Sequence, residues 1–103
     1  MSDITIFWNW GGRYVGYRVF DDLFYCNGWQ AGYFAEGDEV YGCNGEYIGE
    51  VRGDRLITNL SKKAWTRKSL IPRFGKSFPG HRNVTAKEML VGFEDFPAPA
   101  GMN

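Results

Sequence analysis

Large apolar residues recur in pairs along the first sixty residues or so, once every sixteen to eighteen residues: Ile6-Phe7, Phe24-Tyr25, Val40-Tyr41 and Leu56-Ile57. Successive side chains of a strand point to opposite faces, so each pair places one large residue on each face of a short strand. A repeat of this length is too short for a helical hairpin and fits two strands with two tight turns. The pattern predicts four units built from β-hairpins.

Glycines stand at fixed places within these units. Gly11-Gly12, Asn27-Gly28 and Asn44-Gly45 follow the first three pairs, and such dipeptides suit the tip of a hairpin with a type I′ turn. The returning strands also carry a glycine each, at Gly16, Gly32 and Gly49. A glycine weakens a strand unless something needs the room, so we expect a neighbouring backbone or an aromatic ring to pack over each of them.

Hairpins with one apolar face are not stable alone, so the units must share a core, either wrapped around an axis or flattened against a partner. Val15, Ala31 and Ile48 are expected to meet at that axis, and Tyr17, Tyr25, Tyr33 and Tyr41 to form aromatic layers. The unit after Leu56-Ile57 lacks both glycine features and is predicted to be a degenerate fourth unit or a cap. The expected fold is an all-β, up-and-down meander of about seven or eight strands.

A basic segment rich in loop-forming residues follows the repeats. We divide the chain into a hairpin-repeat domain, residues 1–67, and a basic extension, residues 68–103, that packs on the same domain. A short helix is expected at residues 86–92, because Thr85 and Glu88 have the spacing of a capping box and Met89, Leu90 and Phe93 could form an apolar stripe. Residues 97–101 are expected to be an unstructured end.

Four segments of the repeat region form a recognisable pattern. They are the opening Ile6-Phe7-Trp8-Asn9, the pair Val40-Tyr41, the run Gly45-Glu46-Tyr47-Ile48-Gly49 and the last repeat position, residues 55–59. In these features the chain resembles the 4-fold β-flower proteins, small bacterial domains of uncharacterised function. The resemblance covers about residues 4–67. It implies a β-repeat fold and brings no catalytic residues with it.

Charge divides the chain into two halves although the net charge is zero. Residues 1–54 hold three basic and nine acidic residues, and the remainder holds nine basic and three acidic residues. Such polarity can serve an acidic partner, or it can hold the extension against the repeat body or another subunit. The second interpretation is favoured, since most charge separation of this size is satisfied within an assembly or by solvent.

No apolar run approaches the roughly eighteen residues that span a bilayer, and the first residues carry no basic leader. We therefore expect a cytoplasmic protein with no membrane partner and with both of its cysteines reduced.

Several short motifs resemble functional sites, but none of them matches the full pattern that the site requires. Gly75-Lys76-Ser77 resembles the end of a phosphate loop, but Leu70 stands where its first glycine belongs. Cys26, Cys43 and His81 lack the spacing of a structural zinc site and are expected to be two buried thiols and one solvated ring. Arg52-Gly53-Asp54 is interpreted as a turn, and acids such as Asp21, Asp22 and Glu36 as solvated turn residues. No catalytic residue, metal ligand or cofactor is assigned.

The favoured function is a non-catalytic binding or assembly module that associates with itself or with another protein. The architectural residues are those at the turns, the strand glycines and the tyrosine layers: Gly16, Gly28, Gly32, Gly45, Gly49, Tyr17, Tyr25, Tyr33 and Tyr41. The candidate binding surface consists of the aromatic and basic residues Trp29, Trp65, Arg67, Lys68, Arg73, Lys76, His81 and Arg82.

Two alternatives remain open at this point. The basic residues between 62 and 82 alternate with Trp65, Phe74 and Phe78, a mixture that can neutralise phosphates and stack bases, so nucleic-acid or other polyanion binding is one. The other is a small enzyme with an unfamiliar site, which a deep pocket holding His81 beside Cys26 or Cys43 would favour.

Overall fold

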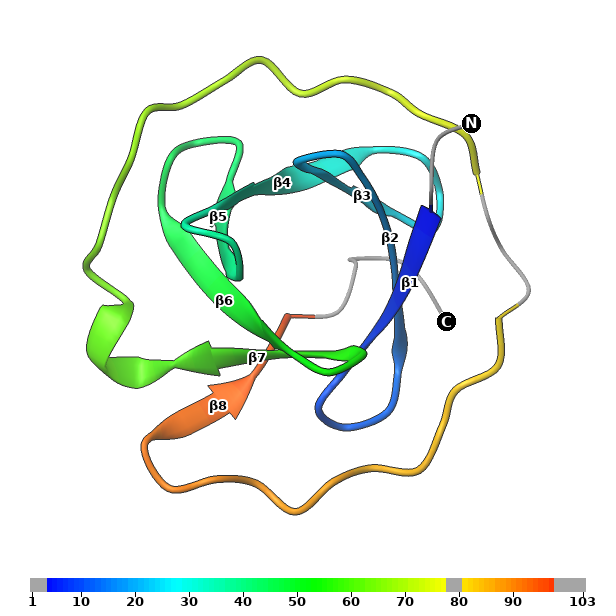
Figure 1. The fold of residues 1–103 in the computed structure, drawn as a ribbon, viewed down its shortest axis with the longest axis vertical. Coiled ribbons are helices and arrows are strands. Elements are labelled where there is room, and N and C mark those ends of the chain that lie inside the picture. Colours follow the sequence, from blue (N-terminus) through cyan, green and yellow to red (C-terminus); the bar gives the residue numbers. More distant parts are fainter. Residues whose placement is uncertain (1–3, 78–80, 98–103) are drawn as a thin grey trace.

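The computed structural model describes residues 4–77 and 81–97, and nearly all of its regular structure is β-strand. Eight strands form one sheet whose spatial order is the order of the chain (Figure 1). They are β1 (Ile4–Asn9), β2 (Tyr14–Val19), β3 (Asp22–Tyr25), β4 (Gln30–Ala35), β5 (Glu39–Gly42), β6 (Tyr47–Arg52), β7 (Arg55–Asn59) and β8 (Phe93–Asp95). The predicted all-β meander of hairpins is confirmed.

The sheet closes into a barrel because β1 also pairs with β7, in parallel, through Trp8–Arg55 and Asn9–Leu56. Only the first part of β7 is used in this way. Residues 57–59 pair instead with β8, in antiparallel register. The two halves of one strand edge therefore bind two strands from opposite ends of the chain.

A β-bulge lies at the same point of each of the first three hairpins. The register shifts by one residue opposite Val15, Ala31 and Ile48, and a bulge of this kind bends and twists its strand. The strand glycines follow directly. A Cβ on Gly16 would stand 1.9 Å from the carbonyl oxygen of Phe24, and one on Gly32 would stand 2.0 Å from that of Tyr41, so neighbouring strands leave no room for a side chain there.

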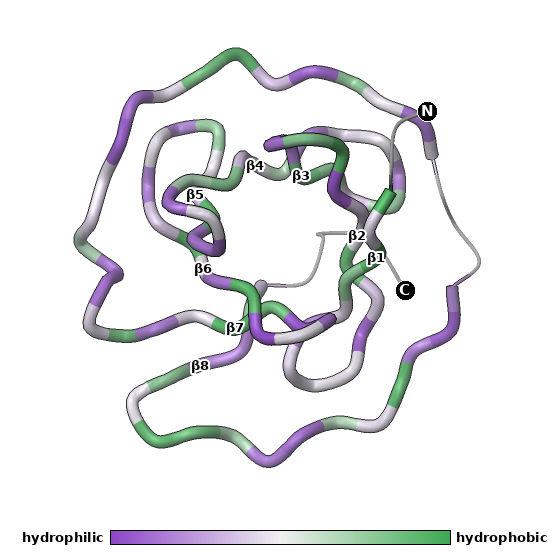
Figure 2. The backbone as a smooth tube through the Cα atoms, viewed as in Figure 1, coloured by the Kyte–Doolittle hydropathy of each residue, from purple (hydrophilic) through white to green (hydrophobic). Residues whose placement is uncertain are grey.

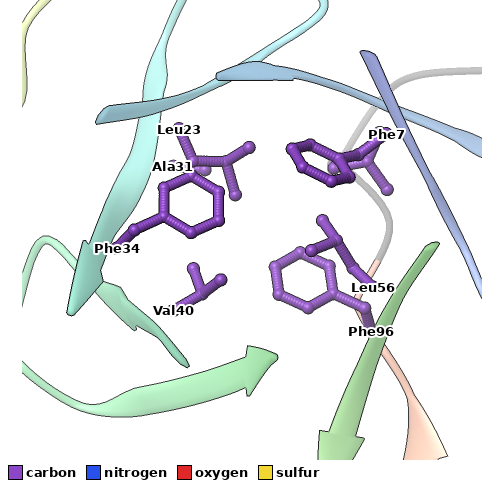
Figure 3. Close-up of a cluster of buried hydrophobic side chains, with 8 residues drawn as sticks. Phe7, Leu23, Ala31, Phe34, Val40, Leu56 and Phe96 are labelled. Carbon is purple, nitrogen blue, oxygen red and sulfur yellow. The ribbon is translucent and has the colours of Figure 1, made fainter. Parts of the chain in front are cut away.

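The core occupies the inside of the barrel, where the strands and the residue after β8 contribute side chains (Figure 3). Ile48 packs against it while remaining partly exposed. Phe96, which is 1% exposed, enters the cluster directly after β8, and its ring would lie 2.4 Å from a Cβ on Gly49. The cluster consists of Phe7, Val15, Leu23, Ala31, Phe34, Val40, Leu56 and Phe96.

The core corrects the alignment of the second unit. Leu23, with no exposed surface, shares the core with Val40, so Phe24 and not Tyr25 corresponds to Tyr41. The alignment of Phe24-Tyr25 with Val40-Tyr41 is wrong by one residue. That of Ile6-Phe7 is also wrong by one residue, because Phe7 pairs with Gly16 as Val40 pairs with Gly49. Both faces of these strands are buried, so hydrophobicity alone does not fix which residue points inward.

The connection from β7 to β8, called the belt here, consists of residues 60–77 and 81–92 as far as it is described. It begins with a short 3₁₀ helix, η1 (Leu60–Lys62), and its described parts lie around the outside of the barrel (Figure 1). The backbone N–H groups of Arg67, Gly75 and Val84 donate to the carbonyl oxygens of Gly45, Gly28 and Gly12 at 2.8, 2.6 and 2.7 Å. Three hairpin tips therefore hold the belt through the same contact.

The belt also covers a second layer of large side chains on the outside of the barrel. Along the belt, polar and apolar residues alternate irregularly (Figure 2). Its carbonyl groups accept hydrogen bonds from the rings below: Tyr17 Oη donates to Lys76 at 2.5 Å, Tyr33 Oη to Lys68 at 2.6 Å and Trp10 Nε1 to Glu88 at 2.8 Å. Tyr14, Tyr17, Phe24, Tyr41 and Tyr47 are consequently buried although they lie outside the core cluster.

The helix expected at residues 86–92 is wrong, because this part of the belt is extended and then turns into β8. Its backbone groups have partners on the barrel. Lys87 N–H donates to the Trp10 carbonyl oxygen at 3.0 Å, and the Thr85 carbonyl oxygen accepts from Arg55 Nη2 at 2.9 Å. The fourth unit is a complete hairpin, β7–β8, whose connecting loop is the belt.

The expected unstructured end lies outside the described residues except for Pro97. Within residues 4–77 and 81–97, no helix has the length and apolar character needed to cross a bilayer.

We predict that Gly45→Ala destabilises the fold more than the control Gly53→Ala, because only Gly45 contacts the belt. Gly45 and Gly53 both have positive φ, +90° and +66°, but a Cβ on Gly45 would lie 2.2 Å from the Arg67 carbonyl oxygen, whereas nothing lies within 4 Å of one on Gly53. Gly53→Ala should lower the free energy of unfolding by about 1 kcal/mol through backbone strain alone. Gly45→Ala should cost about 2 kcal/mol more, since it also displaces the belt. Urea unfolding measures both, and equal losses would contradict the belt contact.

Candidate functional site: a pocket between the barrel and the belt

The residues proposed from the sequence as a binding surface are spread around the molecule. Most lie on the belt, and the belt runs around the barrel instead of along one face (Figure 1). Trp29 packs edge-on against Phe74, with ring centroids 5.1 Å apart, and His81 packs against Tyr14 at 5.0 Å. Trp65 and Arg82 accept hydrogen bonds through their carbonyl groups, from Tyr47 N–H and Trp8 Nε1. Among the eight candidates, only Arg73 and Lys76 line the pocket described next.

That pocket has a volume of about 380 Å³ and lies between strands β1 to β3 and residues 73–76 of the belt. Most of its walls are apolar or aromatic, and its charged residues come from β3 and the belt. This is the composition of small-molecule sites in general, although the volume is at the small end of their range. The lining residues are Ile4, Tyr17, Val19, Phe20, Asp22, Phe24, Arg73, Gly75 and Lys76.

Two stacked rings line the pocket on the barrel side. Tyr17 and Phe24 are paired across β2 and β3, with centroids 5.3 Å apart and planes 19° from parallel. Burial raises the pKa of Tyr17 above its ordinary value. Its hydroxyl group therefore stays protonated at neutral pH and donates to the Lys76 carbonyl oxygen. This bond ties the belt to the ring stack.

Gln30 holds the polar side of the pocket in place. Its side chain is buried, and Nε2 donates to Asp22 Oδ1 at 3.0 Å while Oε1 accepts from the backbone N–H of Arg73 at 3.0 Å. Asp22 in turn forms an ion pair with the Arg73 guanidinium. One buried amide thus positions both members of a charged pair, which favours a preformed site.

The same place in the next unit is filled. Tyr33 and Tyr41 stack there as Tyr17 and Phe24 do, and the Lys68 carbonyl oxygen accepts from Tyr33 as that of Lys76 accepts from Tyr17. Arg67, which binds its hairpin tip as Gly75 does, lies 5.3 Å from the Tyr41 ring and pairs with Glu36 at 3.1 Å. At the equivalent place Gly75 has no side chain, and a Cβ there would stand 2.7 Å from Tyr17 Oη. The Arg73 guanidinium, 6.0 Å from the Phe24 ring, lies over the stack instead.

Phe20 replaces the other member of that ion pair. Phe20 and Glu36 are the two described non-glycine residues with positive φ, at +53° and +50°, and each occupies the turn after the second strand of its hairpin. In the equivalent two-residue turn between β6 and β7, the same first position is Gly53. Phe20 is 77% exposed, so packing does not explain a ring in this backbone conformation. The ring instead lines the pocket.

Charges of the basic C-terminal half pair with acidic residues of the first half inside one chain. Lys62 Nζ binds Glu39 Oε2 at 3.0 Å and Glu50 Oε1 at 3.1 Å, in partly buried surroundings. Burial alone would raise the pKa of Glu39, but hydrogen bonds from Lys62 and Tyr41 hold that pKa below its ordinary value. The meeting of acidic faces with the basic tail of another subunit therefore stays a prediction, and some of the charges on which it rested, such as Lys62 and Glu39, have partners within the chain.

The thiols and the histidine do not meet at the pocket. Cys26 is buried and Cys43 partly buried, both as free thiols, and none of Cys26, Cys43 and His81 lines the pocket. Over the described ranges no group of three or more His, Cys, Asp or Glu side chains could hold a metal ion. The arrangement can bind a ligand, and it offers no nucleophile beside a base.

Sequence reasoning missed most of the pocket. Ile4, Val19 and Phe20 were not singled out, Asp22 was assigned to a solvated turn, and Gly75 was considered only as part of a phosphate loop. The feature that could have found them is the comparison of equivalent positions, where Phe20 and Gly75 stand in place of Glu36 and Arg67.

We predict that Phe20→Gly stabilises the fold. Glycine adopts a φ of +53° without the steric cost that a larger residue pays, so the free energy of unfolding should rise by up to about 1 kcal/mol. Phe20→Ala, which removes the ring but keeps the strain, is the control and should not raise it. Thermal or urea unfolding measures both, and a loss of stability in Phe20→Gly as large as that in Phe20→Ala would show that φ is not strained.

We predict a pH-dependent stability term from Glu39. A carboxyl group with a lowered pKa stabilises the fold above its unfolded value of about 4.5, and this contribution is lost as the pH falls toward the folded value. Glu39→Gln should therefore be less stable than the parent at pH 7, and the difference should shrink at pH 3. Glu94→Gln, which removes the exposed pair with Lys63, is the control and should change stability little. A difference between Glu39→Gln and the parent that does not change with pH would refute this role.

Comparison of the chain with protein-family models, with curated proteins and with solved structures gave no match. The resemblance to the 4-fold β-flower proteins therefore stays a prediction.

Proposed function

We propose that this protein is a non-catalytic binding module, cytoplasmic in location, whose ligand site is the pocket between β1–β3 and the belt. The observation that carries the proposal is the contrast between two equivalent places in the fold. At one place the Glu36–Arg67 pair lies over Tyr41. At the other the Asp22–Arg73 pair lies near Phe24, with the guanidinium 6.0 Å from the ring, and a pocket lined by Phe20 and Gly75 remains beside it. The open place keeps an exposed phenylalanine in a turn with positive φ. Residues in such rare backbone conformations are concentrated at active sites and ligand-binding sites.

The walls of the pocket are held in position before any ligand arrives. Tyr17 is tied to the belt through Lys76, and Asp22 and Arg73 are tied together through Gln30. A preformed site loses less conformational entropy on binding than a site that must order itself. This supports recognition of a small molecule.

Nucleic-acid binding is supported less well. Arg67 and Arg73 are already paired with Glu36 and Asp22, and the belt distributes its basic residues around the barrel (Figure 1). A polyanion needs a continuous basic track on one face. A small enzyme is also supported less well, because the pocket holds no histidine or cysteine.

The test uses N-phenyl-1-naphthylamine, an uncharged fluorescent probe with two connected aromatic parts. We expect saturable binding to the parent protein, measured by fluorescence titration. Gly75→Arg, which places the residue type of Arg67 at the equivalent position, should reduce the affinity by at least about tenfold. The new side chain adds bulk beside the pocket, and its Cβ, which would stand 2.7 Å from Tyr17 Oη, displaces one of the rings that line it.

Two further variants guard against a change in the fold. Phe20→Gly removes one wall without placing a new side chain in the pocket and should weaken binding several-fold. Ile71→Ala alters an exposed apolar residue of the belt outside the pocket and should leave binding unchanged. Absence of binding to the parent, or undiminished binding to both Gly75→Arg and Phe20→Gly, would overturn the proposal.

A further inference from the structure

We infer that the ligand of this pocket is a small aromatic monoanion, such as an aromatic carboxylate or sulfonate, whose negative group is bound by Lys76. The inference rests on the proposed function and adds the chemistry of the ligand to it. It follows from three properties of the pocket: flat aromatic walls, a limited volume and an unbalanced positive charge.

The flat part of the ligand is indicated by the rings that face the pocket. The Tyr17–Phe24 stack presents two nearly parallel rings, and Phe20 supplies a third from the turn. Aromatic rings prefer offset-stacked or edge-to-face neighbours, so a planar guest gains more here than a flexible chain. A volume of about 380 Å³, at the small end of the range of ligand pockets, limits that guest to a few rings.

The negative charge is indicated by counting the charged groups at the pocket. Asp22 and Arg73 form an ion pair and balance each other. Lys76 also lines the pocket, and among the described residues its ammonium group has no ion-pair partner. The described lining of the pocket therefore has two basic residues and one acidic residue, an excess of one positive charge. An anion is attracted more strongly at the mouth of such a partly apolar pocket than in open solvent.

The repeat supplies a control for this charge. Lys68 is the equivalent of Lys76, because each follows the belt residue that binds a hairpin tip and each accepts a tyrosine hydroxyl through its carbonyl oxygen. Lys68 does not line the pocket. Removing its charge changes the net charge of the protein by the same amount as removing that of Lys76.

The experiment compares two probes that have the same aromatic rings and differ by one negatively charged group. One is 8-anilinonaphthalene-1-sulfonate, and the other is N-phenyl-1-naphthylamine, which has the same rings without the sulfonate. We expect the parent protein to bind the anionic probe more tightly. Lys76→Gln should weaken the anionic probe about three- to fivefold, the size of one partly exposed ion pair, and leave the neutral probe unchanged. Lys68→Gln should leave both affinities unchanged.

The outcomes separate this inference from the proposed function. Two results would overturn the inference of an anionic ligand without affecting the proposed binding pocket. One is equal or tighter binding of the neutral probe, and the other is an unchanged ratio of the two affinities in Lys76→Gln. Equal weakening by Lys68→Gln and Lys76→Gln would show an effect of net charge and would also overturn it. Failure of both probes to bind the folded parent would overturn the proposed function itself.

Discussion

The contact between the belt backbone and three hairpin-tip glycines is the interaction on which the rest of this molecule depends. At Gly12, Gly28 and Gly45 the belt approaches so closely that a Cβ would stand 2.0 to 2.6 Å from one of its carbonyl oxygens. This approach lets the belt cover the outer aromatic residues, which would otherwise face water. It also fixes the register of the belt, and the register decides which belt side chain lies over each ring stack. At one of these places the belt residue is Gly75, which lines the pocket.

The fold could be predicted as far as its determinants are local. Asn27-Gly28 and Asn44-Gly45 specify turns within a few residues, and alternation specifies strands. The belt and β8 could not be predicted in this way, because their hydrogen bonds go to distant residues. Thr85 and Glu88 have the spacing of a helix cap, yet Lys87 N–H is bound to Trp10. Tertiary contacts replaced the helical hydrogen bonds that the local sequence favoured.

The candidate site was less accessible to sequence reasoning. Arg73 and Lys76 were identified because basic residues near aromatic ones suggest binding. Phe20 and Gly75 were not identified, since neither an exposed phenylalanine nor a loop glycine is unusual alone. Phe20 and Gly75 become notable only because they occupy the places that Glu36 and Arg67 occupy in the next unit. This equivalence depends on the positions of the bulges and of the belt.

The belt is the loop of the last hairpin, and this has a consequence for how the chain is made. The first three hairpins form from neighbouring residues, whereas Asn59 pairs with Phe93 across the whole length of the belt. Contacts of low sequence separation form early and long loops close late. On the ribosome, the barrel strands emerge before the belt that covers them. A nascent chain that pauses after β7, before the belt has emerged, thus presents uncovered aromatic rings, the kind of surface that chaperones bind and that aggregates if left alone.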